Sequence, residues 1–237
     1  MSPEPKRGTI ALWGLPLLAG LLPLLATVIA FNLSVAQGYF ATCNPFIDGC
    51  VSISRAAREG LGNILFRALL LPAATLQAIV WLLSGSWLRQ LGAPHDRLLR
   101  VLPWIGVTAA VFLMLYGTFL GTEGEGYRLM RRYGINVYFG FTCIAMLIVA
   151  GALRTASRVR RELSHSALLV YALVAALPLL GIINTMRTLY LNSEAAQYAV
   201  GNITEWWGGL MFTVFFVVVA WLWWRTRFDA ALRASIV

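Results

Sequence analysis

Six apolar runs, separated by short polar segments, constrain what this chain can fold into more than any other feature. Each run is close to the roughly 20 residues that an α-helix needs to cross the hydrocarbon core of a bilayer. None of the runs alternates between apolar and polar residues with a period of two, so strands are disfavoured. The sequence therefore predicts an all-α integral membrane bundle, a single transmembrane domain over residues 1–237, with spans at approximately 10–31, 64–83, 101–120, 135–153, 167–183 and 206–224.

The composition indicates that lipid covers most of the surface. Hydrophobic residues make up 59% of the chain and charged residues only 12%, and the mean hydropathy is +0.73. A soluble domain usually carries about 25% charged residues. The net charge of +9 could suggest a nucleic-acid partner, but the cations sit in short clusters between the apolar runs. This placement indicates topology signals and contacts with anionic lipid, and we expect no nucleic-acid partner.

The distribution of cations predicts the orientation of the bundle. With the N-terminus inside, the cytoplasmic segments hold twelve Lys and Arg residues and the outer loops hold six, while Arg67 lies in the second span. Because cytoplasmic loops carry the excess of cations, both termini are expected in the cytoplasm. Lys6 is the only lysine, and the other eighteen cations are arginines. Such usage is typical of a GC-rich bacterial genome, so we expect the bacterial inner (plasma) membrane.

The segment from Cys43 to Cys50 reads Cys-Asn-Pro-Phe-Ile-Asp-Gly-Cys and lies in the first outer loop. Asn, Pro and Asp-Gly favour turns, so this segment can fold back and bring its two sulfur atoms together. An oxidising outer compartment would permit a disulfide there. Free thiols are the main alternative, and a metal site would need two further ligands. Cys143, in the middle of a span, is expected to be an inert packing residue.

Catalytic and cofactor chemistry finds little support in the motifs. The two histidines, His95 and His165, both fall in predicted cytoplasmic loops beside acidic residues. The chain has no zinc-protease helix motif, nucleophile elbow, phosphate-binding loop or dinucleotide glycine pattern. Haem held between two helices would need paired intramembrane histidines, and the spans hold none. We therefore expect no cofactor and no metal, and no recognised motif marks the protein as an enzyme.

Polar residues gather near the predicted outer ends of the spans. Ionisable side chains at this depth are costly unless they are paired or hydrated, so they mark a candidate functional site. One interpretation is a lipid-headgroup pocket in which arginines face a phosphate; the alternative is a set of snorkelling anchors. We expect Arg67 to pair with Glu205 or Asp48. The candidates for headgroup binding are Asn63, Arg67, Asn136, Asn184, Arg187 and Glu205.

Several short motifs carry a resemblance to a known family. They are Asp-Gly-Cys-Val-Ser-Ile-Ser-Arg at 48–55, Phe-Arg-Ala-Leu-Leu-Leu-Pro at 66–72, Gly-Thr-Phe at 117–119 with Tyr-Phe-Gly at 138–140, and Thr-Glu-Trp at 204–206. In this order, around six spans, they resemble the Frag1/DRAM/Sfk1 family of six-helix membrane proteins. The resemblance implies a role in lipid remodelling, in lipid asymmetry or in scaffolding a lipid-modifying partner.

Three functions remain open on the sequence alone. The first is a multi-pass membrane protein that binds lipid headgroups at the outer leaflet, with a role in lipid organisation or remodelling. The second is an accessory subunit of a larger membrane complex, whose partner is another membrane protein or a second copy of the chain. The third is a lipid-modifying membrane enzyme with Glu205 and the outer arginines at its site.

Overall fold

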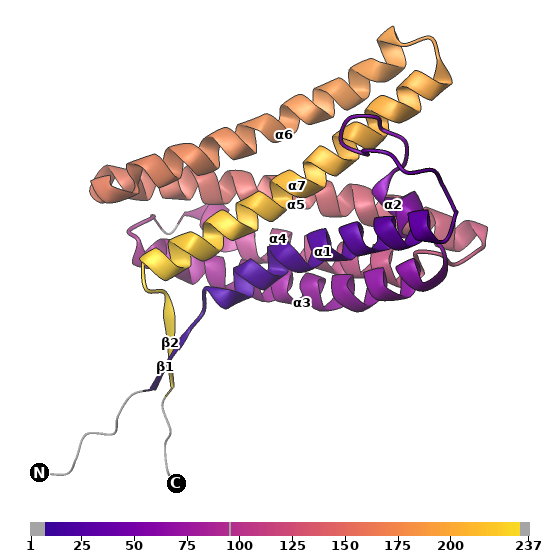
Figure 1. The fold of residues 1–237 in the computed structure, drawn as a ribbon. Coiled ribbons are helices and arrows are strands. Elements are labelled where there is room, and N and C mark those ends of the chain that lie inside the picture. Colours follow the sequence, from indigo (N-terminus) through magenta and orange to yellow (C-terminus); the bar gives the residue numbers. More distant parts are fainter. Residues whose placement is uncertain (1–7, 95, 233–237) are drawn as a thin grey trace, which may run out of the picture.

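Six long helices form a bundle in a computed structural model, which describes residues 8–94 and 96–232 (Figure 1). All six are long and apolar enough to cross a membrane, which confirms the predicted all-α membrane bundle. A short helix, α2 (Ile53–Ala56), precedes α3, and a 3₁₀ turn (Arg161–Leu163) precedes α6. The long helices are α1 (Gly14–Ala36), α3 (Gly60–Gln90), α4 (Arg97–Phe119), α5 (Glu125–Val159), α6 (Ser164–Tyr190) and α7 (Glu194–Arg225).

The six helices pack as a ring in the order of the chain. Each long helix packs against the next one, and α7 closes the ring by packing against α1. Short connections such as 91–96 and 120–124 enforce antiparallel neighbours, because so few residues cannot reach beyond an adjacent helix. The ring order places α1 beside both α3 and α7, so side chains of α3 and α7 meet across the interior of the ring.

A two-stranded ribbon joins the two ends of the described chain. Strand β1 (Gly8–Ala11) pairs antiparallel with β2 (Asp229–Leu232), with Ile10 opposite Ala230. Both strands hang from the same end of the bundle (Figure 1), which we call the inner end; the opposite end is the outer end. An even number of crossings requires this arrangement, and the cation distribution predicts that the inner end is cytoplasmic.

Several helix boundaries differ from the predicted spans. The first helix begins at Gly14 rather than residue 10, because residues 8–11 form β1. Helix α5 begins ten residues before its predicted span, and α7 begins at Glu194 instead of residue 206. The apolar runs mark only the part of each helix that lies in hydrocarbon. Polar turns continue the helix beyond that boundary, because helical backbone bonds do not depend on apolar side chains.

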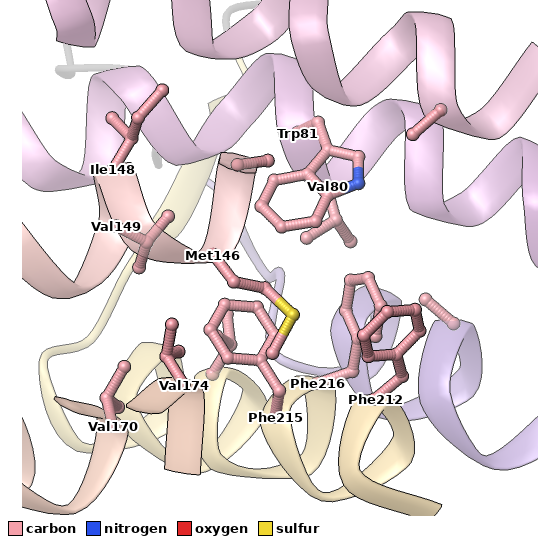
Figure 2. Packing of buried hydrophobic residues seen from close by; sticks show 14 of the residues in the cluster. Val80, Trp81, Met146, Ile148, Val149, Val170, Val174, Phe212, Phe215 and Phe216 are labelled. Atoms are coloured by element: carbon pink, nitrogen blue, oxygen red, sulfur yellow. The ribbon is translucent and has the colours of Figure 1, made fainter. Parts of the chain in front are cut away.

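The inner half of the bundle is filled by apolar side chains (Figure 2). Trp81 of α3 is 1% exposed and stacks on Phe215 of α7, with ring centroids 5.9 Å apart. Met146 of α5 and Phe216 of α7 pack beside it. Gly106 of α4 makes room for the indole ring, because a Cβ atom there would overlap Trp81. This packing closes the centre of the bundle toward the inner end.

Candidate functional site

The outer half of the bundle encloses a cavity of about 70 Å³. Five of the six long helices line it, and Ile53 of α2 lines it from the outer side; α6 does not take part. Most of the lining is apolar, and six side chains bring polar groups. These are Thr27 of α1, Gln77 of α3, Tyr116 of α4, Tyr138 of α5, and Glu205 and Thr213 of α7.

Glu205 is the acidic residue of this cavity, and it has little protein support. The backbone N–H of Ser54 in α2 donates to Glu205 Oε1 over 3.4 Å. Over residues 8–94 and 96–232 the only salt bridge joins Arg128 to Glu125, so no described cation pairs with the Glu205 carboxyl group. Glu205 also lies eleven residues inside α7, whereas the predicted span placed it at the start of a helix. At this position the dipole of the helix N-terminus gives the carboxyl group no stabilisation.

Gln77 marks the deeper end of the cavity. Its Nε2 donates to the carbonyl oxygen of Ala19 over 3.1 Å, while its Oε1 is buried without a hydrogen-bond partner among the described residues. The Thr213 hydroxyl donates to the neighbouring carbonyl of Gly20 over 3.2 Å, so Gln77 and Thr213 lie at a similar depth. Glu205 is eight residues from Thr213 along α7, which corresponds to about 12 Å at 1.5 Å per residue. The polar groups therefore extend along the bundle axis.

The loop 37–59 closes the outer end of this cavity, and we call it the outer loop. The predicted disulfide is confirmed: Cys43 and Cys50 are bonded, with their Cα atoms 6.6 Å apart. The predicted role of Asp48 as a partner of Arg67 is wrong. The Asp48 carboxyl group instead accepts a 2.7 Å bond from the backbone N–H of Asn44 and so stabilises the turn inside the disulfide.

Helix α7 holds the outer loop through side chains that donate to loop carbonyls. Asn202 Nδ2 donates to the carbonyl of Gly49 over 2.7 Å. The indole of Trp206 donates to Val51 over 2.9 Å. Trp206 also meets the ring of Phe46 with centroids 5.2 Å apart, in a separate small apolar cluster. These contacts place the loop over Glu205, because the two anchoring residues of α7 lie on either side of it in the chain.

Removing the disulfide tests how much the outer loop depends on it. For a closed loop of this length, chain entropy predicts that Cys43→Ser with Cys50→Ser lowers the free energy of unfolding by roughly 2–3 kcal/mol. Thermal unfolding in detergent, with and without reductant, measures the loss. Cys143→Ser is the matched control because Cys143 is a free thiol and lies within α5. A double variant that unfolds at the wild-type temperature would contradict the expectation.

Two of the predicted headgroup residues, Asn63 and Arg187, donate to backbone carbonyls. Asn63 Nδ2 donates to the carbonyls of Ala57 and Leu120, over 2.9 and 3.2 Å, and so ties the end of the outer loop to the end of α4. Arg187 Nη1 donates to the carbonyl of Gln197 over 2.6 Å, and its Nε donates to the carbonyl of Asn184 over 3.1 Å.

Asn184 completes a link from α6 to the site. Its Oδ1 accepts a 3.2 Å bond from the hydroxyl of Thr204, the residue before Glu205. The structure therefore brings Asn184 and Arg187 to the α7 segment that carries Glu205, whereas Asn63 braces the opposite part of the ring. A role for any of them in headgroup binding stays a prediction.

Of the six predicted headgroup residues, all of which are described, Glu205 alone lines the cavity. Arg67 is half-buried on α3, and within the described part of the chain it forms no ion pair, so its predicted pairing with an outer acid is wrong. Asn136 is exposed on α5 and does not line the cavity. His165 is exposed at the start of α6, and His95 lies outside the described residues.

Sequence reasoning missed Gln77, Tyr116 and Tyr138 as cavity residues. Gln77 stands alone as an amide in the middle of the second apolar run, which was an available signal of an interior polar contact. The tyrosines gave no such signal, because an aromatic residue in a span is as common at the lipid surface as inside.

The outer half of α6 does not line the cavity and holds no buried residue. The buried residues of α6 all lie between Ser166 and Leu177, and no residue from 178 to 190, a fully described range, is buried. Near the outer end, α6 and the start of α7 lie apart from α5 (Figure 1). Between α5 and α7, Phe139 and Phe212 both line the cavity and contact each other with ring centroids 5.0 Å apart.

Comparison with known proteins adds no identification. No family model, curated protein or solved structure matches this chain, so the resemblance to the Frag1/DRAM/Sfk1 family rests on its short sequence motifs.

Proposed function

We propose that this protein binds the headgroup of an outer-leaflet lipid in the Glu205 cavity and acts in lipid organisation or remodelling. The observation that carries the proposal is a carboxyl group with little protein support, in a cavity of the outer half of a membrane bundle. Ionisable groups are kept at such depth when they face a ligand, a pathway or a partner group. Glu205 has no charged partner in the described chain, so a ligand is the simplest account.

The size and shape of the cavity favour a headgroup. A volume of about 70 Å³ has room for about five water-sized groups, since one such group needs 10–15 Å³. An acyl chain would instead lie outside, along the uncovered sides of α5 and α6. The apolar packing around Trp81 closes the inner half, which favours binding from one side over passage through the bundle.

We also propose that the protein resides in a bacterial inner membrane, with the outer loop in the periplasm. The arginine-rich inner segments support this orientation. The disulfide between Cys43 and Cys50 supports an oxidising compartment at the outer end, because disulfides are rare where thiols are kept reduced.

Filling the cavity tests the proposed function. In Gly209→Met the new side chain enters the cavity, where the atom nearest to its Cβ, Cδ1 of Ile53 at 3.3 Å, belongs to a flexible side chain that can yield. We expect native mass spectrometry from mild detergent to show bound phospholipid on the wild type and at least a tenfold lower bound fraction on this variant. Gly140→Met is the control, because a Cβ atom at that residue meets no described atom within 4 Å beyond its own turns of α5.

Two outcomes would contradict lipid binding in the cavity. The first is equal lipid occupancy in the wild type, Gly209→Met and Gly140→Met. The second is a protein of fixed stoichiometry that co-purifies with the wild type in place of lipid, which would favour an accessory subunit of a larger complex.

A further inference from the structure

We infer that the headgroup taken up by the cavity is a primary ammonium group, as in an ethanolamine phospholipid. This inference rests on the proposed function and names its ligand class. It follows from the carboxyl group of Glu205, an acceptor with unused capacity that lines a cavity without a described cation.

Glu205 sets the preference for a positively charged donor. An ionised carboxylate only accepts hydrogen bonds, and its two oxygens offer about four acceptor sites. Protein support comes from the backbone of α2, where the N–H of Ser54 donates over 3.4 Å, at the long end of hydrogen-bond distances. Burial of a carboxylate without a cation is costly, and an ammonium ligand offsets that cost by charge and by hydrogen bonding.

Gln77, at the deeper end of the cavity, lies too far from Glu205 for one ammonium group to reach both. Its Oε1 is buried without a hydrogen-bond partner among the described residues, but it lies about 12 Å from Glu205 along the bundle axis. The ammonium group is therefore assigned to Glu205 alone.

The arginines argue against a phosphate inside the cavity. Among residues 8–94 and 96–232, no arginine or lysine lines it. Arg187, near the same stretch of α7, already donates from Nη1 and Nε to two backbone carbonyls. A phosphate needs several hydrogen-bond donors, preferably charged ones. Among the described residues the cavity wall offers hydroxyl groups of tyrosine and threonine but no Arg or Lys side chain. The phosphate of a bound phospholipid therefore stays outside, and the ammonium group enters.

A methylation series of lipids tests this inference on the full-length protein. Phosphatidylethanolamine, its N-methyl and N,N-dimethyl derivatives, and phosphatidylcholine keep one positive charge and one phosphate while the number of N–H donors falls from three to zero. With identical acyl chains, we expect affinity by native mass spectrometry to fall at each step and by at least tenfold over the series. Glu205→Gln should bind phosphatidylethanolamine at least tenfold more weakly and lose this ranking.

Glu194→Gln is the matched control, because it makes the same substitution at an exposed residue of the same helix. It should keep both the affinity and the ranking. Equal affinity for phosphatidylethanolamine and phosphatidylcholine, or tighter binding of phosphatidylglycerol than of either, would overturn the ammonium assignment. If binding then still disappears in Gly209→Met, only this inference fails. If Gly209→Met binds every lipid like the wild type, the proposed function fails as well.

Discussion

Replacing Gly49 with alanine is expected to lower the free energy of unfolding by more than about 3 kcal/mol and to unseat the outer loop. Gly49 has φ +61°, a left-handed conformation that costs other residues about 1–2 kcal/mol. A Cβ atom there would also lie 2.8 Å from Cα of Ala199 and overlap its carbonyl group. Because that obstacle is helix backbone of α7, no side-chain rotation can relieve the overlap.

Gly38→Ala separates the two costs. Gly38 also has positive φ, +77°, but no atom of the described residues lies within 4 Å of a Cβ atom there. It should therefore lose only the conformational cost of about 1–2 kcal/mol. Thermal unfolding in detergent compares the two variants, and lipid retention by Gly49→Ala reports on the seating of the loop. Equal losses in the two variants would show that the loop does not need its close approach to α7.

Truncating Trp206 is expected to have an effect of similar size. Trp206 is 3% exposed, packs on Phe31 and Phe46, and donates to the carbonyl of Val51. Substituting a buried tryptophan with alanine typically costs about 3–5 kcal/mol. Trp206→Phe keeps most of the packing and loses the hydrogen bond, so it should cost about 1 kcal/mol from that bond.

Trp104→Ala is the control for Trp206→Ala, because Trp104 is 77% exposed on α4. It removes the same side chain with little loss of protein packing, so the unfolding temperature should stay near that of the wild type. The ranking of Trp206→Ala, Trp206→Phe and Trp104→Ala is read from thermal unfolding followed by intrinsic fluorescence. A Trp206→Ala protein as stable as Trp104→Ala would mean that the outer loop contributes little to the fold.

The spans could be predicted because the requirement of the bilayer is simple: about 20 apolar residues in a row. The ends of α5 and α7 could not, since their first turns are polar and lie beyond the apolar run. The ribbon of β1 and β2 was missed for a different reason. Four-residue strands carry almost no periodic signal, and the pairing joins residues from opposite ends of the chain.

At the site, too, features set by local sequence could be predicted and features set by helix packing could not. The bond between Cys43 and Cys50 was predictable because the two residues are only seven apart and turn residues lie between them. Glu205 was identified by its charge, but the predicted pairing with Arg67 was wrong, because pairing is not a local property. It depends on which helices are neighbours and on which side chains face each other across the ring. Hydropathy does not encode that order, nor the rotation of each helix about its own axis.

The anchoring of the outer loop has a consequence for how the protein folds during its synthesis. The loop is translated early, but Gly49 is held by Asn202, which follows 153 residues later. At about 5–20 residues per second, synthesis of the intervening chain takes roughly 8–30 s. In the proposed orientation, the two cysteines of the loop face the oxidising compartment during that time and can form their disulfide. The Cys43–Cys50 disulfide therefore has time to form before α7 is synthesised. Helix α7 then packs against an outer loop that is already cross-linked.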